Sequence, residues 1–240
     1  MSNNSLVDHL ISSGYLKTPE IIGAFKKIDR VDFVPDNLKS EAYEDAPLPI
    51  GHGQTISQPA TVAFMLELLE PRAGDKILDI GFGSGWTTAL MAEIVSSPVI
   101  LSEAERSEAE RRISSVRSFG LRPQDDNKEK GRVYAIERIP ELCELGRGNM
   151  EKYEFIKKGI VECFSADGTK GLPDKAPFDK ILAGASAKEL PGAWKEQLKI
   201  GGRIVAPIEW RVWLFIKKSE TEFEEMEHPG FAFVPLISLP

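Results

Sequence analysis

Apolar and polar positions alternate along this chain in a way that predicts strands and helices in turn. Short apolar runs bounded by glycines or turn residues predict buried strands, whereas apolar residues at every third or fourth position predict amphipathic helices. The predicted strands cover residues 77–80, 132–137, 160–165, 178–183, 203–208, 212–217 and 231–236. The predicted helices cover residues 6–15, 20–28, 60–69, 87–95, 141–153 and 191–198. Strands that alternate with helices indicate an α/β fold with a mostly parallel sheet and an antiparallel end.

Local signals mark the start of two of these helices. Thr18 is expected to be the N-cap of helix 20–28, with Pro19 at the first helical position. Ser57 is placed to cap helix 60–69, with Pro59 in the first turn, and such a cap stabilises a helix by about 1 kcal/mol. The segment 51–59 before that helix is polar and rich in glycine and hydroxyl groups, and we expect its His52 to be a solvated loop residue.

A glycine-rich turn joins the apolar run 77–80 to helix 87–95. Its three glycines, Gly81, Gly83 and Gly85, follow the pattern G-x-G-x-G, whereas dinucleotide-binding folds use G-x-G-x-x-G. Strand, turn and helix together form half of a βαβ nucleotide-binding unit, in which glycine lets the backbone turn sharply and approach a ligand. Asp79 lies at the carboxyl end of the strand, where an acid suits a ligand with positive charge, such as the sulfonium and ammonium groups of S-adenosylmethionine (SAM). The alternative is a purely structural turn.

The second strand of this unit comes later than a βαβ unit requires. Residues 96–130 intervene, and they contain the tandem repeat Ser-Glu-Ala-Glu-Arg at 102–106 and 107–111. Glu137 ends the next strand 56 positions after Gly81, and removing an insertion of about 30 residues restores the usual spacing of about 20 residues to the acid that holds a ribose. We therefore interpret 96–130 as an insertion. It joins a helix to the amino end of a strand, so we expect an exposed appendage on the side away from the ligand.

Composition limits the class of protein. The chain has 240 residues, which fits one large α/β domain with appendages, and a hydrophobic content of 42% with 28% charged residues is typical of a soluble globular protein. The net charge of −7 argues against a general nucleic-acid binder. We expect no membrane span and no secretory signal, because no long apolar run is present and residues 1–10 lack a basic start. Cys143 and Cys163 show no metal-ligand spacing, so we expect no metal site and two free thiols in a reducing cytoplasm.

Several separate stretches, taken together, match one known family. They are Val31-Asp32-Phe33-Val34-Pro35, Ala42-Tyr43-Glu44-Asp45, Gly53-Gln54-Thr55-Ile56-Ser57-Gln58-Pro59, 78–85, Asp167-Gly168, 177–184, Gln197-Leu198, Gly201-Gly202-Arg203 and Phe233-Val234-Pro235-Leu236. On these stretches the chain resembles the protein-L-isoaspartate O-methyltransferase family, over nearly all of its length except 96–130. The segment 53–59 is the specific one, because the glycine turn alone indicates only a SAM-dependent methyltransferase. Phe82 and Trp86 depart modestly from the family pattern.

The resemblance implies a single domain over residues 1–240 with a Rossmann-like, doubly wound, seven-stranded sheet. Residues 1–59 would form an N-terminal helical and substrate-loop extension. The implied reaction is protein repair: a methyl group passes from SAM to the α-carboxyl of an L-isoaspartyl residue in a damaged protein or peptide. The ester then collapses to a succinimide, which reopens in part to normal aspartate.

The resemblance also implies roles for individual residues. Ser57 falls on the serine assigned to the active site of the family, Glu137 on the acid that binds the ribose hydroxyls, and Asp167 with Gly168 on the pair that contacts the adenine. The expected cofactor-binding residues are Gln54, Thr55, Ile56, Asp79, Gly81, Gly83, Ser84, Gly85, Glu137, Arg138, Asp167 and Gly168.

The chemistry of the expected reaction places modest demands on the protein. A chain α-carboxyl has a pKa near about 3.5, so the nucleophile is already ionised at neutral pH and no strong general base is required. The protein has to align oxygen, methyl carbon and sulfur, which can supply about 7–11 kcal/mol. We expect isoaspartyl proteins and peptides as partners, and a cytoplasmic monomer. Two alternatives stay open: the same scaffold acting on another carboxylate, or a SAM-binding module without activity. An NAD dehydrogenase is disfavoured by the glycine spacing.

Overall fold

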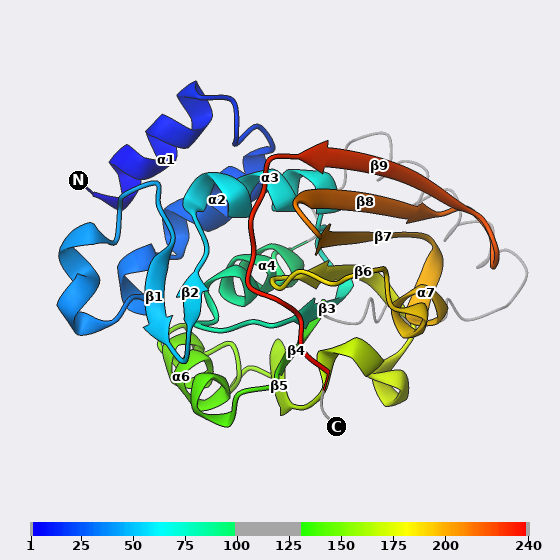
Figure 1. Ribbon diagram of the computed structural model, residues 1–240. Helices are drawn as coiled ribbons and strands as arrows, with labels where there is room; N and C mark the ends of the chain where they lie inside the picture. The colour runs from blue at the N-terminus through cyan, green and yellow to red at the C-terminus, as the bar shows by residue number, and fades with distance from the viewer. Residues whose placement is uncertain (1, 99–130, 239–240) are drawn as a thin grey trace, which may run out of the picture.

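A seven-stranded sheet forms the centre of the molecule. The structure, a computed structural model, describes residues 2–98 and 131–238, and the strand order in the sheet is β5-β4-β3-β6-β7-β8-β9 (Figure 1). The strands are β3 (Lys76–Ile80), β4 (Arg132–Glu137), β5 (Val161–Ser165), β6 (Phe178–Ala183), β7 (Leu198–Ile208), β8 (Arg211–Lys217) and β9 (Phe223–Pro229). Pairing is parallel from β5 through β7 and antiparallel from β7 to β9. The predicted α/β fold with an antiparallel end is confirmed.

Helices cover both faces of the sheet, which explains why its central strands are nearly continuous apolar runs. Along β3, the side chain of Ile77 packs into the core on one face and those of Leu78 and Ile80 into the core on the other. The larger core includes the buried side chains of the N-terminal helices, and the smaller one includes Trp194. The α-helices are α1 (Asn3–Ser12), α2 (Pro19–Lys27), α3 (Pro59–Leu69), α4 (Trp86–Ser96), α6 (Pro140–Glu151) and α7 (Gly192–Gln197).

Short elements connect the N-terminal helices to the sheet. They are the 3₁₀ helices η1 (Arg30–Phe33) and η2 (Asp36–Glu41) and the antiparallel hairpin of β1 (Leu48–Gly51) and β2 (Gln54–Ile56). Two further 3₁₀ turns, η3 (Gly168–Lys170) and η4 (Pro173–Lys175), lie between β5 and β6. Two helices, two 3₁₀ helices and a short hairpin thus precede α3.

The C-terminal region differs from the prediction. The last strand is β9, whereas residues 231–236, predicted as a strand, make only an isolated bridge between Pro235 and Ser186. The sequence of β9 is rich in glutamate and mostly exposed, so it has no apolar alternation to reveal it. It forms because β8 offers a free edge, and charged side chains are typical of such an edge strand. Strand β7 also begins earlier than predicted, at Leu198, and includes the expected turn at 201–202.

Of the two predicted helix caps, the one at Thr18 is confirmed in position and the one at Ser57 is not. Thr18 occupies the N-cap of α2, but its hydroxyl donates to a carboxylate oxygen of Glu67 at 2.7 Å instead of capping its own helix. At α3 the N-cap is Gln58, not Ser57. The carboxylate of Asp45 accepts a hydrogen bond from the Ala60 backbone N–H at 2.8 Å. The prediction that Ser57 caps α3 is wrong, because a distant carboxylate satisfies the helix instead.

The predicted insertion lies outside the described residues from position 99 to position 130. Its described flanks lie at the amino end of β3: the Gly74 N–H donates to the Val95 carbonyl at 3.0 Å, and the Arg132 N–H donates to the Asp75 carbonyl at 3.0 Å. Among the described residues, Cys143 and Cys163 are both free thiols. Across the same residues, no helix is long and apolar enough to cross a membrane.

Candidate functional site

A cleft opens at the carboxyl edge of the parallel strands. Its walls come from the β2 segment, α3, the turn after β3, the end of β4, the loop after β6 and a stretch near the C-terminus. The lining residues are Gln54, Thr55, Ile56, Ser57, Val62, Met65, Asp79, Ile80, Gly81, Phe82, Gly83, Ser84, Trp86, Thr87, Ile136, Glu137, Arg138, Ile139, Gly168, Leu182, Ala183, Gly184, Ala185, Phe233, Val234, Pro235, Leu236 and Ile237. Open α/β sheets bind their ligands at this edge.

The glycine turn forms the floor of the cleft, and its backbone requires glycine. Gly81, Gly83 and Gly85 have φ values of 76°, 51° and 86°, in the left-handed region that side chains disfavour. The Gly81 N–H donates to the Ile136 carbonyl at 2.8 Å, which ties the turn to β4. The turn therefore presents its backbone, without side chains at these positions, toward the space above the sheet.

Glu137 links the end of β4 to the glycine turn. Its carboxylate accepts hydrogen bonds from the backbone N–H of Gly83 at 3.0 Å and from that of Ile139 at 2.9 Å. The residue is only 7% exposed, yet it lines the cleft. A carboxylate offers about four acceptor positions, so these two bonds leave acceptor capacity facing the cleft.

Asp79 places a second acid beneath the same turn. It is 2% exposed and accepts a hydrogen bond from the Thr88 hydroxyl at 2.5 Å. Burial raises the pKa of Asp79 to about 7, with a smaller contribution from the nearby negative charge of Glu137, while the Thr88 hydroxyl opposes the rise. A cationic group bound above this carboxyl would favour its ionised form.

The segment from Gln54 to Ser57 forms the wall opposite the glycine turn. Because Asp45 holds the start of α3, the Ser57 side chain is not committed to that helix. Within the described part of the chain, no hydrogen-bond partner satisfies its hydroxyl, and Ser57 is half-buried on the cleft. The hydroxyl is thus available to a ligand in the cleft.

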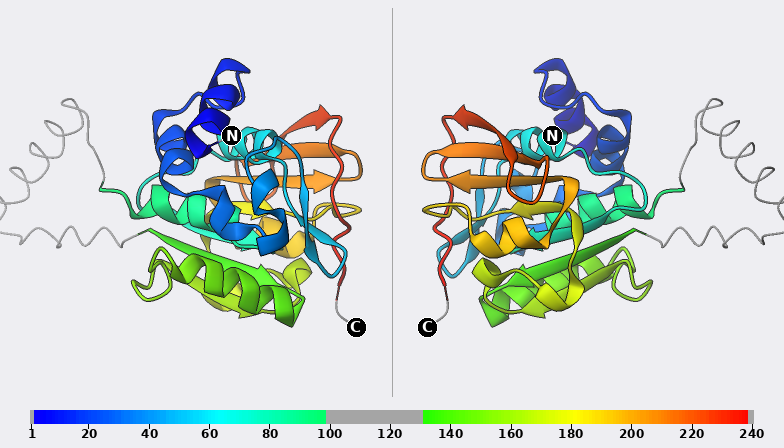
Figure 2. Two further views of the ribbon diagram at one scale, coloured as in Figure 1. Left: turned by 90° about the vertical axis from the view of Figure 1, so that its left-hand side faces the viewer. Right: turned by 90° about the vertical axis from the view of Figure 1, so that its right-hand side faces the viewer.

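Residues 233–237 close the side of the cleft near β6. The Ser186 N–H donates to the Val234 carbonyl at 2.8 Å, and the Leu236 N–H donates to the Ser186 carbonyl at 2.7 Å. Figure 1 shows this C-terminal segment, in red, descending from the end of β9 across the edge of the sheet. In Figure 2 it lies on the same side of the molecule as the β1–β2 hairpin. The two segments frame the cleft from opposite ends of the sequence.

Comparison with known proteins assigns this arrangement to a family. The family model of protein-L-isoaspartate(D-aspartate) O-methyltransferase matches residues 1–117 and 127–239. The chain belongs to this family. A protein-L-isoaspartate O-methyltransferase from Methanopyrus kandleri is 40% identical over 236 residues, which cover 97% of this chain and 89% of that protein. A relative of the same description from Ignicoccus hospitalis is 40% identical, with 97% of this chain and 95% of that protein covered.

A solved structure supports the fold. A Plasmodium falciparum protein described as a protein-L-isoaspartate O-methyltransferase, in complex with S-adenosyl-L-homocysteine, superposes with a TM-score of 0.77. The match covers 99% of both chains at 22% sequence identity. The Rossmann-like methyltransferase fold that the sequence predicts is therefore confirmed.

The structure brings most of the predicted site residues together on one cleft, with two exceptions. Gly85 turns toward α6, where an added Cβ would lie 2.9 Å from the Gly146 carbonyl oxygen. Asp167 points one carboxylate oxygen back to Thr169, accepting from its backbone N–H at 2.9 Å and from its hydroxyl at 2.7 Å. Its neighbour Gly168 lines the cleft. Gly85 and Asp167 thus do not line the cleft, but each contacts residues next to it.

Several cleft residues were not predicted from the sequence. Phe233 to Leu236 lay in the predicted strand 231–236, although their match to the family was a usable signal, and Ile237 carried no prediction. Val62 and Met65 line the cleft from α3, where helical spacing identified them only as core residues. In the described part of the chain, no group of three or more His, Cys, Asp and Glu side chains is arranged to hold a metal ion.

Proposed function

We propose that this protein transfers a methyl group from SAM to the α-carboxyl of L-isoaspartyl residues in damaged proteins and peptides. Membership of the family supports the reaction. The observation that carries the site assignment is the placement of the Gln54–Ser57 wall on the same cleft as the glycine turn and Glu137. Substrate and cofactor can therefore meet across one narrow space.

The residues of the cleft fit SAM. Gly81 and Gly83, both with positive φ, leave backbone without side chains on the cleft floor. Glu137 keeps acceptor capacity for ribose hydroxyls, and Asp79 supplies negative charge below the turn. When bound, SAM supplies an activated methyl group on a positively charged sulfur. Glu137 would hold the ribose, and the carboxyl of Asp79 would favour a cationic ligand. Gly168 would border the adenine.

The chain's own task is to orient a carboxylate that is already a nucleophile. Ser57 would donate its hydroxyl proton as a hydrogen bond to one carboxylate oxygen and direct the other toward the methyl donor. The start of α3 does not offer its first free N–H for this purpose, because Asp45 already accepts from Ala60. Ser57 can take this role because its hydroxyl has no hydrogen-bond partner among the residues that the structure describes. After transfer, the methyl ester loses methanol as the next peptide nitrogen closes the succinimide.

The remaining features of the chain are consistent with this role. We infer a single domain in which residues 1–59 form the substrate side and residues 96–130 form an insertion away from the site. We also infer a cytoplasmic monomer that needs neither nucleic acid nor a membrane surface, which the net charge of −7 supports. Gel filtration with light scattering tests the monomer directly.

The reaction is tested by tritium transfer from labelled SAM to an isoaspartyl peptide, with the matching aspartyl peptide as control. Transfer to the first peptide alone is expected. Transfer to neither, with S-adenosylhomocysteine still bound, would refute the reaction and indicate an inactive SAM-binding protein. Transfer to both would indicate a less selective carboxyl methyltransferase.

Ser57 is tested by replacing it with alanine. Ser57→Ala should lower kcat for the isoaspartyl peptide by about tenfold or more, since one hydrogen bond to a charged group contributes about 1.5–3 kcal/mol. Its free energy of unfolding should stay within about 0.5 kcal/mol of the wild type, as for a surface substitution. Full activity in this variant would remove Ser57 from the site.

A further inference from the structure

Arg30 is a buried cation that the proposed reaction does not yet use. It lies in η1 with 0% of its surface exposed. Its guanidinium donates hydrogen bonds to four backbone carbonyls: Ala42 at 2.7 Å, Glu44 at 3.1 Å, Ala46 at 2.9 Å and Ser57 at 3.1 Å. Burial lowers the pKa of Arg30 to about 10, so the group stays charged at neutral pH. A buried charge is costly to desolvate, and these bonds are what hold it.

The same guanidinium also contacts the cofactor side of the cleft. Its central carbon lies 5.3 Å from the centroid of the Trp86 ring, over the face of that ring. Trp86 is the first residue of α4, directly after Gly85, and it lines the cleft. Arg30 therefore joins two walls: it holds the main chain at Ser57 on one side and packs on the residue that follows the glycine turn on the other.

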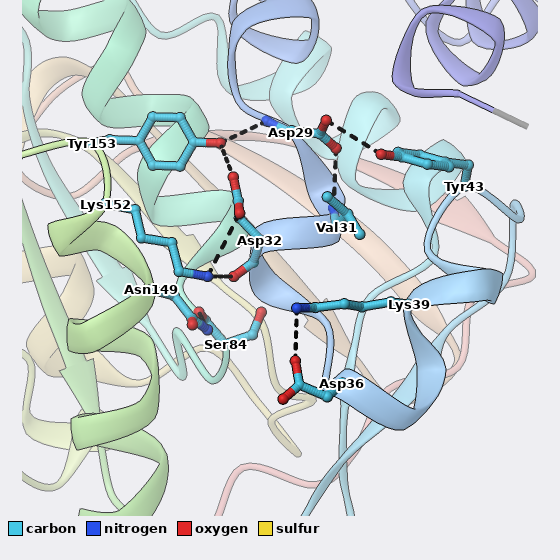
Figure 3. Close-up of polar contacts among 10 residues, drawn as sticks. All are labelled: Asp29, Val31, Asp32, Asp36, Lys39, Tyr43, Ser84, Asn149, Lys152 and Tyr153. Carbon is cyan, nitrogen blue, oxygen red and sulfur yellow. Dashed lines mark hydrogen bonds and ion pairs between the residues drawn. The ribbon is translucent and has the colours of Figure 1, made fainter.

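The segment that carries Arg30 is itself fixed to α6 and the residues just after it. The Tyr153 hydroxyl donates to a carboxylate oxygen of Asp32 at 2.8 Å and accepts from the Asp29 backbone N–H at 2.9 Å (Figure 3). The Lys152 ammonium donates to the Asp32 carbonyl at 2.6 Å. Figure 3 shows these side chains reaching from the end of α6 to the residues on either side of Arg30.

Helix α6 holds the glycine turn as well. The Asn149 side-chain amide donates to the Ser84 carbonyl at 3.0 Å. Helix α6 and the residues just after it thus contact both the glycine turn and η1, and Arg30 in η1 bonds to the Ser57 carbonyl. Because Arg30 also packs on Trp86, which follows the glycine turn, these contacts link the Ser57 segment to the glycine turn by two routes.

We propose that Arg30 is a positioning residue for methyl transfer, which sets the Ser57 wall at a fixed separation from the glycine turn. The proposal rests on the proposed function. Lysine cannot replace it, because an ammonium has three donors on one nitrogen and lacks the planar fork that reaches four carbonyls. Misplacing reacting groups by about 1 Å can lower a rate about 100-fold, so the effect should fall on kcat and not on cofactor affinity.

The test is Arg30→Lys, compared with Lys39→Ala. Lys39 lies in η2, and its ammonium forms an exposed ion pair with Asp36 at 2.7 Å. In Arg30→Lys, kcat for the isoaspartyl peptide should fall about 10- to 100-fold, the Kd of S-adenosylhomocysteine by calorimetry should stay within about twofold, and amide hydrogen exchange over residues 54–58 should rise. Lys39→Ala should match the wild type in all three measurements.

Tyr153→Phe keeps the test decisive if Arg30→Lys does not fold. It leaves the ring stacked on Phe33 and Phe155 and removes only the hydroxyl that anchors η1, so kcat should fall about threefold or more with unchanged affinity for S-adenosylhomocysteine. Unchanged kcat in the folded variants, or a loss of cofactor affinity in proportion to kcat, would overturn the positioning role while the wild type remains active. A wild type that does not methylate isoaspartyl peptide would instead overturn the proposed function, and with it this role.

Discussion

Gly146 is the residue of α6 whose replacement should damage the site most directly. A Cβ added at Gly146 would lie 2.5 Å from the Gly83 carbonyl oxygen and 2.7 Å from Cε2 of the Phe82 ring. The Gly83 carbonyl oxygen is a main-chain atom, and the N–H of the same residue donates a hydrogen bond to Glu137. Gly146→Ala must therefore push the helix and the glycine turn apart, because the Gly83 carbonyl oxygen belongs to the main chain and cannot move by rotation of a side chain.

Gly148 on the same helix is a matched control. A Cβ there meets nothing within 4 Å. Both alanine variants gain the same helix propensity, about 0.8–1.0 kcal/mol relative to glycine. The difference between them therefore isolates the cost of forcing the methyl group against the turn, which is about 1–3 kcal/mol for an overpacked core. Gly148→Ala should be more stable than the wild type, and Gly146→Ala should be less stable than Gly148→Ala by that difference.

Two assays check this prediction. Denaturant unfolding measures the difference in unfolding free energy between the two variants. Calorimetry measures the affinity of each variant for S-adenosylhomocysteine, which reports whether the glycine turn keeps its position. We expect Gly146→Ala to bind that ligand at least about tenfold more weakly, equivalent to about 1.4 kcal/mol, and Gly148→Ala to bind it as the wild type does. Equal stability and equal affinity in the two variants would refute the claim that α6 supports the glycine turn.

Three further predictions follow from the site. In the protein without ligand, burial raises the pKa of Asp79 to about 7, so folding favours the protonated carboxyl. The free energy of unfolding should therefore be higher near pH 4 and should fall as the pH rises through about 7. Urea unfolding at pH 5 and pH 8 should show the loss in the wild type but not in Asp79→Asn. Asp45→Ala should cost about 1 kcal/mol of unfolding free energy, because α3 loses its cap; a loss in Ser57→Ala and none in Asp45→Ala would reverse the assignment. Glu137→Gln should weaken S-adenosylhomocysteine binding roughly tenfold by calorimetry, since an amide offers one acceptor oxygen where two N–H groups donate.

Much of the sheet could be predicted from the sequence because its signals are local. A buried strand is a short apolar run, and the strand 132–137 was predicted with the bounds that the structure has. The turn after β3 contains glycines with positive φ, so the glycine pattern in the sequence predicts the backbone conformation of this turn. The acid that follows this turn at Glu137 was identified by spacing once residues 96–130 were set aside, and it does line the cleft. The strand and turn signals are properties of neighbouring residues, whereas Glu137 was found by counting along the chain.

What the tertiary structure decided depends on residues far apart in the chain. Ser57 has the local pattern of a helix cap, yet Asp45 takes that role, because folding places a carboxylate within 2.8 Å of the Ala60 N–H. In the sequence, Gly146 only lowers the helix propensity of its segment. In the structure, an added Cβ there would lie 2.5 Å from the Gly83 carbonyl oxygen. Arg30 has no signal in sequence at all, since its partners extend from Ala42 to Trp86. A local pattern specifies the conformation of a segment, whereas contacts such as these exist only after the chain has closed on itself.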